Sequence, residues 1–219
     1  MGTDVKSAPR KCKTGENLWY CRIKRLCDVG GALVGGIVLM PVMLLIALAV
    51  KLDSPGPALF RQERLGKNGR PFILYKFRSM VVDAERNGPC WAEHDDVRCT
   101  RVGHFLRRSH LDELPQFWNI LRGEMSFVGP RPERAYFYHL LEGEIPDFAL
   151  RMQVVPGLTG LAQISGGFSR DPRKKLAFDL YYINRCSLWL DFRCLVKTVL
   201  VALRIPSEQE GISCQTIPS

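Results

Sequence analysis

Residues 29–50 read VGGALVGGIVLMPVMLLIALAV, a run that holds no charged side chain. As one helix it would be roughly 33 Å long, about the thickness of the hydrocarbon core of a bilayer. The whole chain is 46% hydrophobic and 24% charged, which is an ordinary globular balance. The apolar run therefore decides the fold, because it concentrates in one segment the surface that lipid must cover.

Pro41 stands near the middle of this run, where its missing N–H and its ring bend a helix. Two arms of about ten residues, each roughly 15 Å long, reach only the bilayer midplane. The run is flanked on both sides by basic residues, which collect in cytoplasmic loops: Arg22, Lys24 and Arg25 before it, and Lys51, Arg61 and Arg64 after it. We therefore favour a re-entrant helix-break-helix over residues 22–51 to a single kinked span, which a proline also permits.

The remaining chain predicts one catalytic domain at residues 52–205. Strand patterns at residues 59–64 and 72–77 surround Asn68-Gly69 and predict a hairpin. Helical spacing recurs at residues 111–121, 134–141 and 188–203; the last stretch is amphipathic and could lie in the membrane interface or pack on the protein's own core. The predicted fold class is α/β (α+β): a single, mainly helical cytoplasmic domain with a small sheet, the re-entrant membrane helix and amphipathic interfacial helices. Residues 1–21 and 206–219 are predicted to be tails.

The formal net charge of +9 predicts an anionic partner. Nucleic acid, lipid headgroups and phosphorylated substrates satisfy that charge equally well, but no nucleic-acid-binding motif is present, and we expect no nucleic-acid partner. The eight cysteines form no C-x-x-C pair, and none of the four histidines pairs with another at metal-ligand spacing. These patterns exclude the common zinc sites.

The sequence RRSHLDELPQ at residues 107–116 is the densest group of candidate catalytic residues. Adjacent carboxylates at a helix start are usually surface residues that the helix dipole favours, and we expect the dipole to keep Asp112 and Glu113 ionised. Here Arg107 precedes them and the proline-flanked Arg131 follows, so cations and a carboxylate nucleophile can meet at one phosphoryl group. A carboxylate can attack phosphorus to form an acyl phosphate, and its neighbour can help hold a divalent cation.

Four motifs together carry a family resemblance. They are LYKFRSM at residues 74–80, TRVGHFLRRSHLDELPQFWNILRGEMSFVGPRP at 100–132, PGLTGLAQISG at 156–166 and FDLYYIN at 178–184. In this order they resemble the bacterial sugar transferase family of small monotopic phosphoglycosyl transferases, over residues 24–203. The resemblance also implies a re-entrant membrane helix, although Met40-Pro41 stands where many relatives have Ser-Pro.

The resemblance implies a role for each matching residue. Asp112 would attack the sugar-bearing phosphate of a UDP-sugar and release UMP, and the phosphosugar would pass from the enzyme to undecaprenyl phosphate. Glu113, with Asp112, would hold Mg²⁺ and assist proton transfer. The residues expected to contact the phosphates or the nucleotide are Lys76, Arg78, Arg107, Arg131 and Asp179. Lys76 and Arg78 could instead form structural ion pairs, and Asp179 is either on the nucleotide side of the site or structural.

The implied partners are a UDP-sugar, undecaprenyl phosphate and the phospholipid bilayer, with the catalytic domain on the cytoplasmic side of the inner membrane. The step would open the assembly of an exopolysaccharide, capsule, O-antigen or glycoprotein glycan, and the sequence indicates neither the sugar nor the pathway. A homodimer is left open. The alternative is a non-catalytic, membrane-tethered module that binds anionic lipid or nucleotide, which would function without the carboxylate of Asp112.

Overall fold

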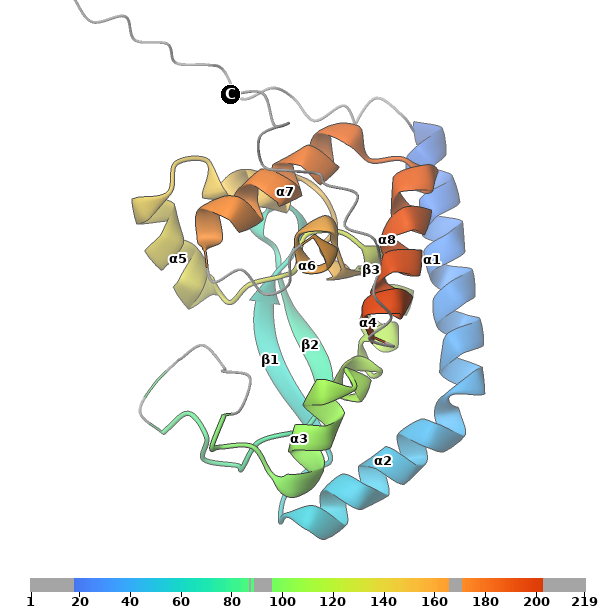
Figure 1. Ribbon diagram of the computed structural model, residues 1–219, viewed down its shortest axis with the longest axis vertical. Helices are drawn as coiled ribbons and strands as arrows, with labels where there is room; N and C mark the ends of the chain where they lie inside the picture. Colours follow the sequence, from blue (N-terminus) through green and yellow to red (C-terminus); the bar gives the residue numbers. More distant parts are fainter. Residues whose placement is uncertain (1–17, 87, 89–95, 166–170, 203–219) are drawn as a thin grey trace, which may run out of the picture.

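A computed structural model of the chain describes residues 18–86, 88, 96–165 and 171–202. Two long helices run along one side and the lower end of the molecule, and shorter helices surround two small sheets (Figure 1). In chain order the helices and strands are α1 (Leu18–Val38), α2 (Met40–Asp53), β1 (Leu59–Leu65), β2 (Pro71–Phe77), α3 (Arg101–Arg108), α4 (Gln116–Arg122), β3 (Ser126–Val128), α5 (Ala135–Glu144), β4 (Gly157–Thr159), α6 (Leu161–Ile164), α7 (Pro172–Arg185) and α8 (Leu188–Ala202). The expected mainly helical α+β architecture is confirmed.

Helices α1 and α2 form a bent pair with an angle of 62° at their junction. Leu39 interrupts the helix, and Pro41 falls in the first turn of α2, where its missing N–H costs no helical hydrogen bond. Among the described residues no single helix has the length and apolarity to cross a membrane, whereas this bent pair passes that test together. The expected bend is present, and the two helices extend beyond the apolar run, with 21 residues in α1 and 14 in α2.

The predicted hairpin is confirmed. Strands β1 and β2 are antiparallel, and Arg64 stands opposite Phe72 while Gln62 stands opposite Leu74. The connecting turn holds Asn68 and Gly69 at positive φ, the region that asparagine and glycine tolerate best. Because alternate residues of a strand share a face, Lys76 lies on the same face as the buried Phe72 and Leu74. The hairpin thus carries two cations on its core side, Lys76 of β2 and Arg64 of β1, which stands opposite Phe72.

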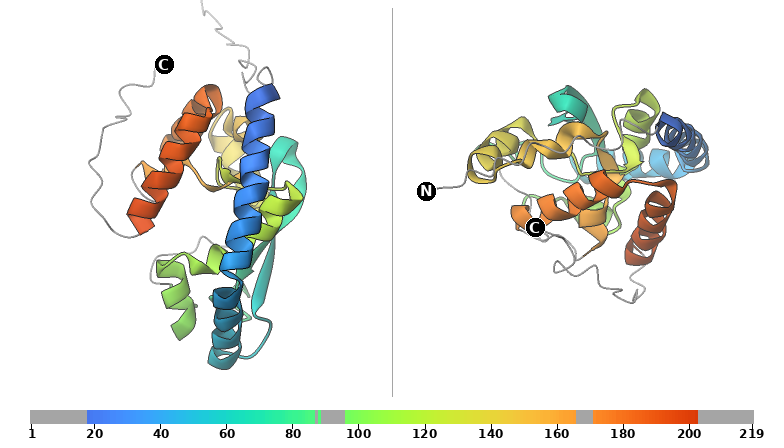
Figure 2. Two further views of the ribbon diagram at one scale, coloured as in Figure 1. Left: turned by 90° about the vertical axis from the view of Figure 1, so that its right-hand side faces the viewer. Right: turned by 90° about the horizontal axis from the view of Figure 1, so that it is seen from above.

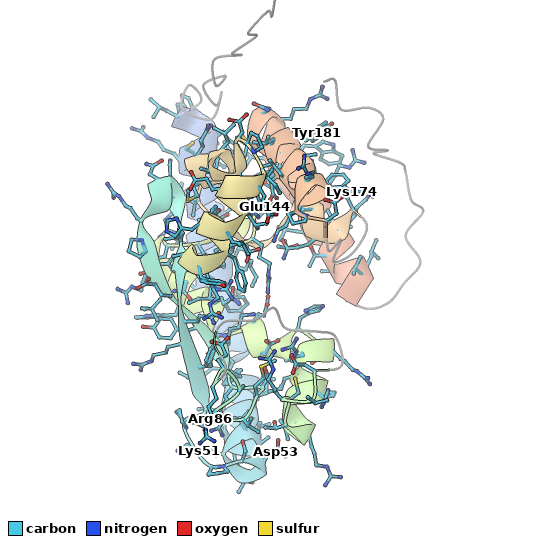
Figure 3. All side chains as sticks on the ribbon, turned by 90° about the vertical axis from the view of Figure 1, so that its left-hand side faces the viewer. Lys51, Asp53, Arg86, Glu144, Lys174 and Tyr181 are labelled. Atoms are coloured by element: carbon cyan, nitrogen blue, oxygen red, sulfur yellow. The ribbon has the colours of Figure 1, made fainter. Side chains whose placement is uncertain are left out.

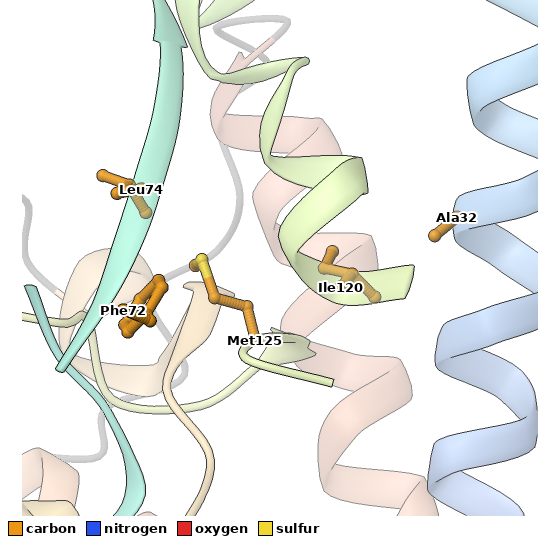
Figure 4. Packing of buried hydrophobic residues seen from close by; sticks show 5 residues of the cluster. All are labelled: Ala32, Phe72, Leu74, Ile120 and Met125. Carbon is orange, nitrogen blue, oxygen red and sulfur yellow. The ribbon is translucent and has the colours of Figure 1, made fainter. Parts of the chain in front are cut away.

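The N-terminal helix is packed into the domain and is not a detached anchor. Ala32 of α1 contacts the core cluster that Phe72, Leu74, Ile120 and Met125 form between β2 and α4 (Figure 4). Two hydrogen bonds reinforce this contact, because the guanidinium of Arg25 donates to the carbonyls of Ile120 (2.6 Å) and Leu121 (2.8 Å) at the end of α4. Residues 18–21, which the sequence placed in a tail, form the first turn of α1.

Helix α8 turns its polar side inward. Asp191 and Cys194 are buried, and Asp191 accepts hydrogen bonds from the hydroxyls of Tyr182 (2.6 Å) and Tyr20 (2.8 Å). Helices α1 and α8 therefore meet near their first turns and diverge toward their other ends (Figure 2). Leu190 packs against the core, whereas most other large apolar side chains of α8 are exposed: Leu188, Trp189, Phe192, Leu195, Val196, Val199 and Val201. The alternative in which this apolar face packs on the protein's own core is therefore wrong.

Candidate active site

Asp112 and Glu113 lie in a sharp turn between two helices. Helix α3 ends at Arg108, and His110 then adopts a left-handed conformation with φ 56° and ψ 14°. A short 3-10 turn, Leu111–Glu113, follows, and α4 begins only at Gln116. The sequence predicted both carboxylates at the N-terminus of a helix. In the structure they lie one tight turn before that helix begins. A left-handed non-glycine residue is energetically unfavourable, so the surrounding packing must hold this turn in place.

Glu113 is held by two cations from distant parts of the chain. Lys76 Nζ of β2 donates to Glu113 Oε1 at 2.7 Å. Arg131, in the proline-rich loop after β3, donates through Nη2 to Oε1 and through Nη1 to Oε2, the latter at 3.3 Å. Burial opposes ionisation of Glu113, but Arg131 and Lys76 outweigh burial and hold its pKa well below the ordinary 4.5. Glu113 is therefore ionised and fixes the positions of both cations.

Asp112 has the opposite electrostatic character. Its residue is 7% exposed, and the nearest cation, Lys76 Nζ, lies 3.9 Å from Oδ2, beyond hydrogen-bonding distance. Burial raises the pKa of Asp112 above its ordinary 3.8; the charge of Glu113 adds to this, while Lys76, Arg131 and Arg107 oppose it. Burial and neighbouring charges shift the pKa values of the two carboxylates in opposite directions, a difference that the helix-dipole argument for both residues did not predict.

Four of the predicted site residues thus form one cluster: Lys76, Asp112, Glu113 and Arg131. Arg107, in the last turn of α3, belongs to its surroundings, because its charge lowers the pKa of Asp112. The cluster joins β2, the 3-10 turn and the loop after β3, which are separated in sequence and meet only in the fold. We call these four residues the carboxylate cluster.

Arg78 lies elsewhere. Its guanidinium donates to the carbonyls of Ser54 (2.7 Å), Pro55 (2.5 Å) and Val50 (3.3 Å) at the end of α2, and the residue is buried. These bonds join the last turn of α2 to the two residues that follow it. Arg78 therefore supports the junction between α2 and β1 through carbonyl contacts, which differ from both the phosphate contact and the ion pair that the sequence suggested.

Asp179 also lies outside the carboxylate cluster. Its Oδ2 accepts from Arg151 Nε at 2.7 Å and lies 2.6 Å from Nη2, and both side chains are almost fully buried. Arg151 Nη2 in turn donates to the backbone carbonyl of Arg131 at 3.1 Å. Asp179 thus supports the loop of Arg131 through Arg151. Of the two roles that the sequence left open, this contact favours the structural one over a contact with the nucleotide.

Three residues close to the site were missed in the sequence. Arg64 stands beside the loop of Arg131 and donates to the carbonyl of Pro132 at 3.2 Å, whereas Gln116 is almost fully buried next to Lys76. Arg151 supports the same loop from behind. Gln116 lies inside the quoted RRSHLDELPQ stretch and could have been selected there. Arg64 and Arg151 carry no local signal, because their partners are distant in sequence.

The carboxylates of Asp112 and Glu113 suit a magnesium ion that is shared with a substrate better than a metal ion held by the protein alone. Within the described ranges no group of three or more His, Cys, Asp and Glu side chains is placed to bind a metal ion. Asp112 and Glu113 offer two adjacent carboxylates, and Mg²⁺ is commonly bound by one or two carboxylates together with substrate phosphates. These two residues therefore fit a magnesium ion that arrives with a phosphorylated substrate.

Comparison with known proteins agrees with the motifs. The pattern of the bacterial sugar transferase family matches residues 19–205. A UDP-N-acetylgalactosamine-undecaprenyl-phosphate N-acetylgalactosaminephosphotransferase of Aeromonas hydrophila is 44% identical over 187 residues, which cover 84% of this chain and 44% of the relative. A UDP-glucose:undecaprenyl-phosphate glucose-1-phosphate transferase of Caulobacter vibrioides is 45% identical, covering 80% of this chain and 68% of the relative. The exopolysaccharide production protein PSS of Rhizobium leguminosarum bv. phaseoli is 42% identical, covering 83% and 95%. The chain thus spans less than half of the Aeromonas relative and nearly all of the Rhizobium one.

Proposed function

Because the chain belongs to the bacterial sugar transferase family, we propose that it transfers a sugar 1-phosphate from a UDP-sugar to undecaprenyl phosphate and releases UMP. Two of the relatives named above, those of Aeromonas and Caulobacter, act on undecaprenyl phosphate by their names and differ in the sugar, N-acetylgalactosamine in one and glucose in the other. The reaction class is therefore the common element, and the sugar of this chain is not assigned.

One observation carries the proposal: a buried carboxylate that accepts no hydrogen bond from the described cations stands beside one that binds two. Asp112 keeps its oxygens free of hydrogen bonds to Lys76 at 3.9 Å, while Glu113 orients Lys76 and Arg131 at its side. A nucleophile needs an available oxygen, and the transferred phosphoryl group needs positioned cations. The two neighbouring carboxylates divide these tasks between them.

The proposed exchange has two displacements. An Asp112 oxygen bonds to the sugar-bearing phosphorus as the bond between that phosphorus and the oxygen bridging to the uridine phosphate breaks, and UMP leaves with the bridging oxygen. An oxygen of undecaprenyl phosphate then bonds to the same phosphorus, and the carboxylate of Asp112 leaves. Lys76, Arg107 and Arg131 neutralise the phosphate oxygens during both steps. The same three charges lower the pKa of Asp112 in the structure and so oppose the burial that raises it.

We propose Mg²⁺ as the cofactor, held by Asp112 and Glu113 together with the donor's phosphates. Such an ion supplies charge neutralisation on the phosphate oxygens and on the departing UMP. Glu113 keeps its negative charge for this purpose, because Arg131 and Lys76 outweigh its burial.

The bilayer is the remaining proposed partner. Exposed apolar side chains line α2 and the lower part of α1, and others cover the outer face of α8. We propose that the bent pair re-enters the cytoplasmic leaflet and that α8 lies in the interface, with Trp189 near the headgroups. This placement brings the carboxylate cluster to the level at which the acceptor phosphate is exposed.

A panel of UDP-sugars tests the reaction. With undecaprenyl phosphate and Mg²⁺ present, purified enzyme is expected to release UMP from at least one UDP-sugar, and chelation of Mg²⁺ should depress that release severely. The product lipid should carry one sugar and two phosphates by mass spectrometry. A non-catalytic module that binds lipid or nucleotide would bind members of the panel and release no UMP from any of them.

Single-cysteine labelling tests the re-entrant helix. In a cysteine-free background, Trp19→Cys and Lys51→Cys place exposed thiols in the first turn of α1 and the last turn of α2, at the two ends of the bent pair. Figure 3 shows Lys51 and Lys174 at opposite ends of the molecule, and Lys174→Cys serves as the catalytic-domain control. A membrane-impermeant maleimide is expected to label all three positions only after the cells are permeabilised. Labelling of residue 19 on intact spheroplasts would instead indicate a span.

A further inference from the structure

Gln116 and Arg64 each hold a buried hydrogen-bond donor without a partner among the described residues, and both residues line one small recess. The residue Gln116 is 1% exposed, and within the described part of the chain its Nε2 has no hydrogen-bond partner. The same holds for the buried Nε of Arg64, although its two terminal nitrogens donate to Pro132 and Gln62. Both side chains line one recess, which is bordered by Arg64, Leu74, Lys76, Gln116, Arg131 and Pro132.

Unpaired donors of this kind need an explanation. More than nine in ten buried polar groups in proteins are paired, and leaving one unpaired is destabilising. Burial also lowers the pKa of Arg64 to about 10, with Glu133 opposing the shift and Arg131 adding to it. Two such groups in one recess indicate that an acceptor completes the site.

Among the described residues, no other side chain that borders the recess supplies an acceptor. Glu113, the nearest carboxylate to Lys76 and Arg131, already accepts hydrogen bonds from both. The other polar side chains of the recess are Lys76 and Arg131, which only donate. The recess has room for about one oxygen atom and none for a sugar or base ring.

We propose that Gln116 Nε2 and Arg64 Nε donate to a phosphate oxygen of the nucleotide-sugar donor, which makes both of them substrate-binding residues. This inference rests on the proposed function. Lys76 connects the recess to the nucleophile, because it lines the recess and lies 3.9 Å from Asp112. An oxygen in the recess therefore belongs to the same diphosphate whose sugar-bearing phosphorus meets Asp112. A phosphate oxygen has lone pairs for both donors and a charge that matches the surrounding cations.

Gln116→Leu tests this assignment, because leucine is of similar size and removes only the amide. Binding of UDP, which carries the diphosphate and nucleoside of the proposed donor, is measured calorimetrically on the full chain in detergent with Mg²⁺. The variant is expected to bind UDP about tenfold more weakly, as expected for one lost hydrogen bond to a charged group. Its affinity for uridine should equal that of the wild type. Its melting temperature should be unchanged or higher, because an unpaired donor has been removed.

Two further variants sharpen the result. Gln116→Glu places an acceptor and a negative charge in the recess, and a larger loss of UDP affinity is expected than for Gln116→Leu. Gln163→Leu is the matched control, because Gln163 of α6 also holds a buried atom without a partner, Oε1, but does not line the recess. Its affinity for UDP should equal that of the wild type.

The possible results test the phosphate contact of Gln116 separately from the proposed transfer reaction. A lower melting temperature with unchanged UDP affinity in Gln116→Leu would show that the donors hold a structural water, and the inference would be wrong. Absence of measurable UDP binding by the wild type would also overturn it. If UDP binding depends on Gln116 and no UDP-sugar yields UMP, the phosphate contact stands and the proposed reaction falls. If UMP is released normally by Gln116→Leu and UDP binds it as tightly as the wild type, only the inference falls.

Discussion

Asp112→Asn is expected to abolish UMP release from any UDP-sugar, by at least about 10⁴-fold, because the substitution removes the nucleophile and leaves the site's shape intact. Enzyme trapped with donor alone should then carry no phosphosugar on the peptide that holds residue 112. The wild type should carry one, detected by mass spectrometry.

The same variant should fold as well as the wild type or better. A raised pKa means that folding disfavours the ionised carboxylate, so Asp112 lowers the stability of the folded state at neutral pH. An uncharged amide of the same shape removes this penalty, and the urea midpoint at pH 7 should be unchanged or higher. Asp147→Asn is the matched control: Asp147 is exposed and left-handed, a conformation that asparagine also tolerates, so activity should be normal. Residual turnover in Asp112→Asn would exclude a covalent aspartyl intermediate.

Glu113→Gln should impair both folding and activity, in contrast to its neighbour. Glu113 pairs with Lys76 and Arg131, and removing its charge leaves two largely buried cations without their carboxylate. Breaking a buried ion pair in this way costs about 3–5 kcal/mol. Displaced cations and a weakened magnesium site should lower the rate of UMP release on the order of 100-fold.

The pH dependence of the stability lost in Glu113→Gln follows from the direction of the pKa shift of Glu113. The pKa of Glu113 is depressed in the folded state, so its contribution is fully present above the ordinary value of 4.5 and is lost as the pH falls below it. The difference in urea midpoint between wild type and Glu113→Gln should therefore be largest at pH 6–7 and shrink below pH 4.5. The exposed Glu142→Gln should match the wild type throughout. Equal stability of Glu113→Gln and wild type at pH 7 would show that the carboxylate cluster contributes nothing to folding.

Together the two variants test how neighbouring carboxylates acquire different roles. The residues are adjacent in sequence and buried in the same turn, yet one has a raised and the other a lowered pKa. The difference arises from distance: two cations contact Glu113, and the nearest cation stands 3.9 Å from Asp112. A reversed pattern, with Asp112→Asn unstable and Glu113→Gln stable, would exchange the proposed roles.

The sequence by itself determined the features that depend on local pattern. The uncharged run with Pro41 predicted a bent apolar helix pair, and alternation around Asn68-Gly69 predicted the hairpin. Periodicity and backbone preference act over a few residues, so they can be read without knowledge of the fold. The quoted motifs likewise identified the family and the carboxylate pair before any geometry was known.

Only the tertiary structure decided which side chains meet. Lys76 and Arg78 are two residues apart, yet one reaches Glu113 and the other binds the end of α2, because the strand ends at Phe77 between them. An amphipathic pattern is the same whether its apolar face points inward or outward. In α8 the buried hydrogen bonds that Asp191 accepts hold the polar face inward, so the apolar face points outward. Hydrogen bonds and ion pairs between residues far apart in sequence require their atoms to be placed to within a few tenths of an ångström. No local pattern encodes such a placement.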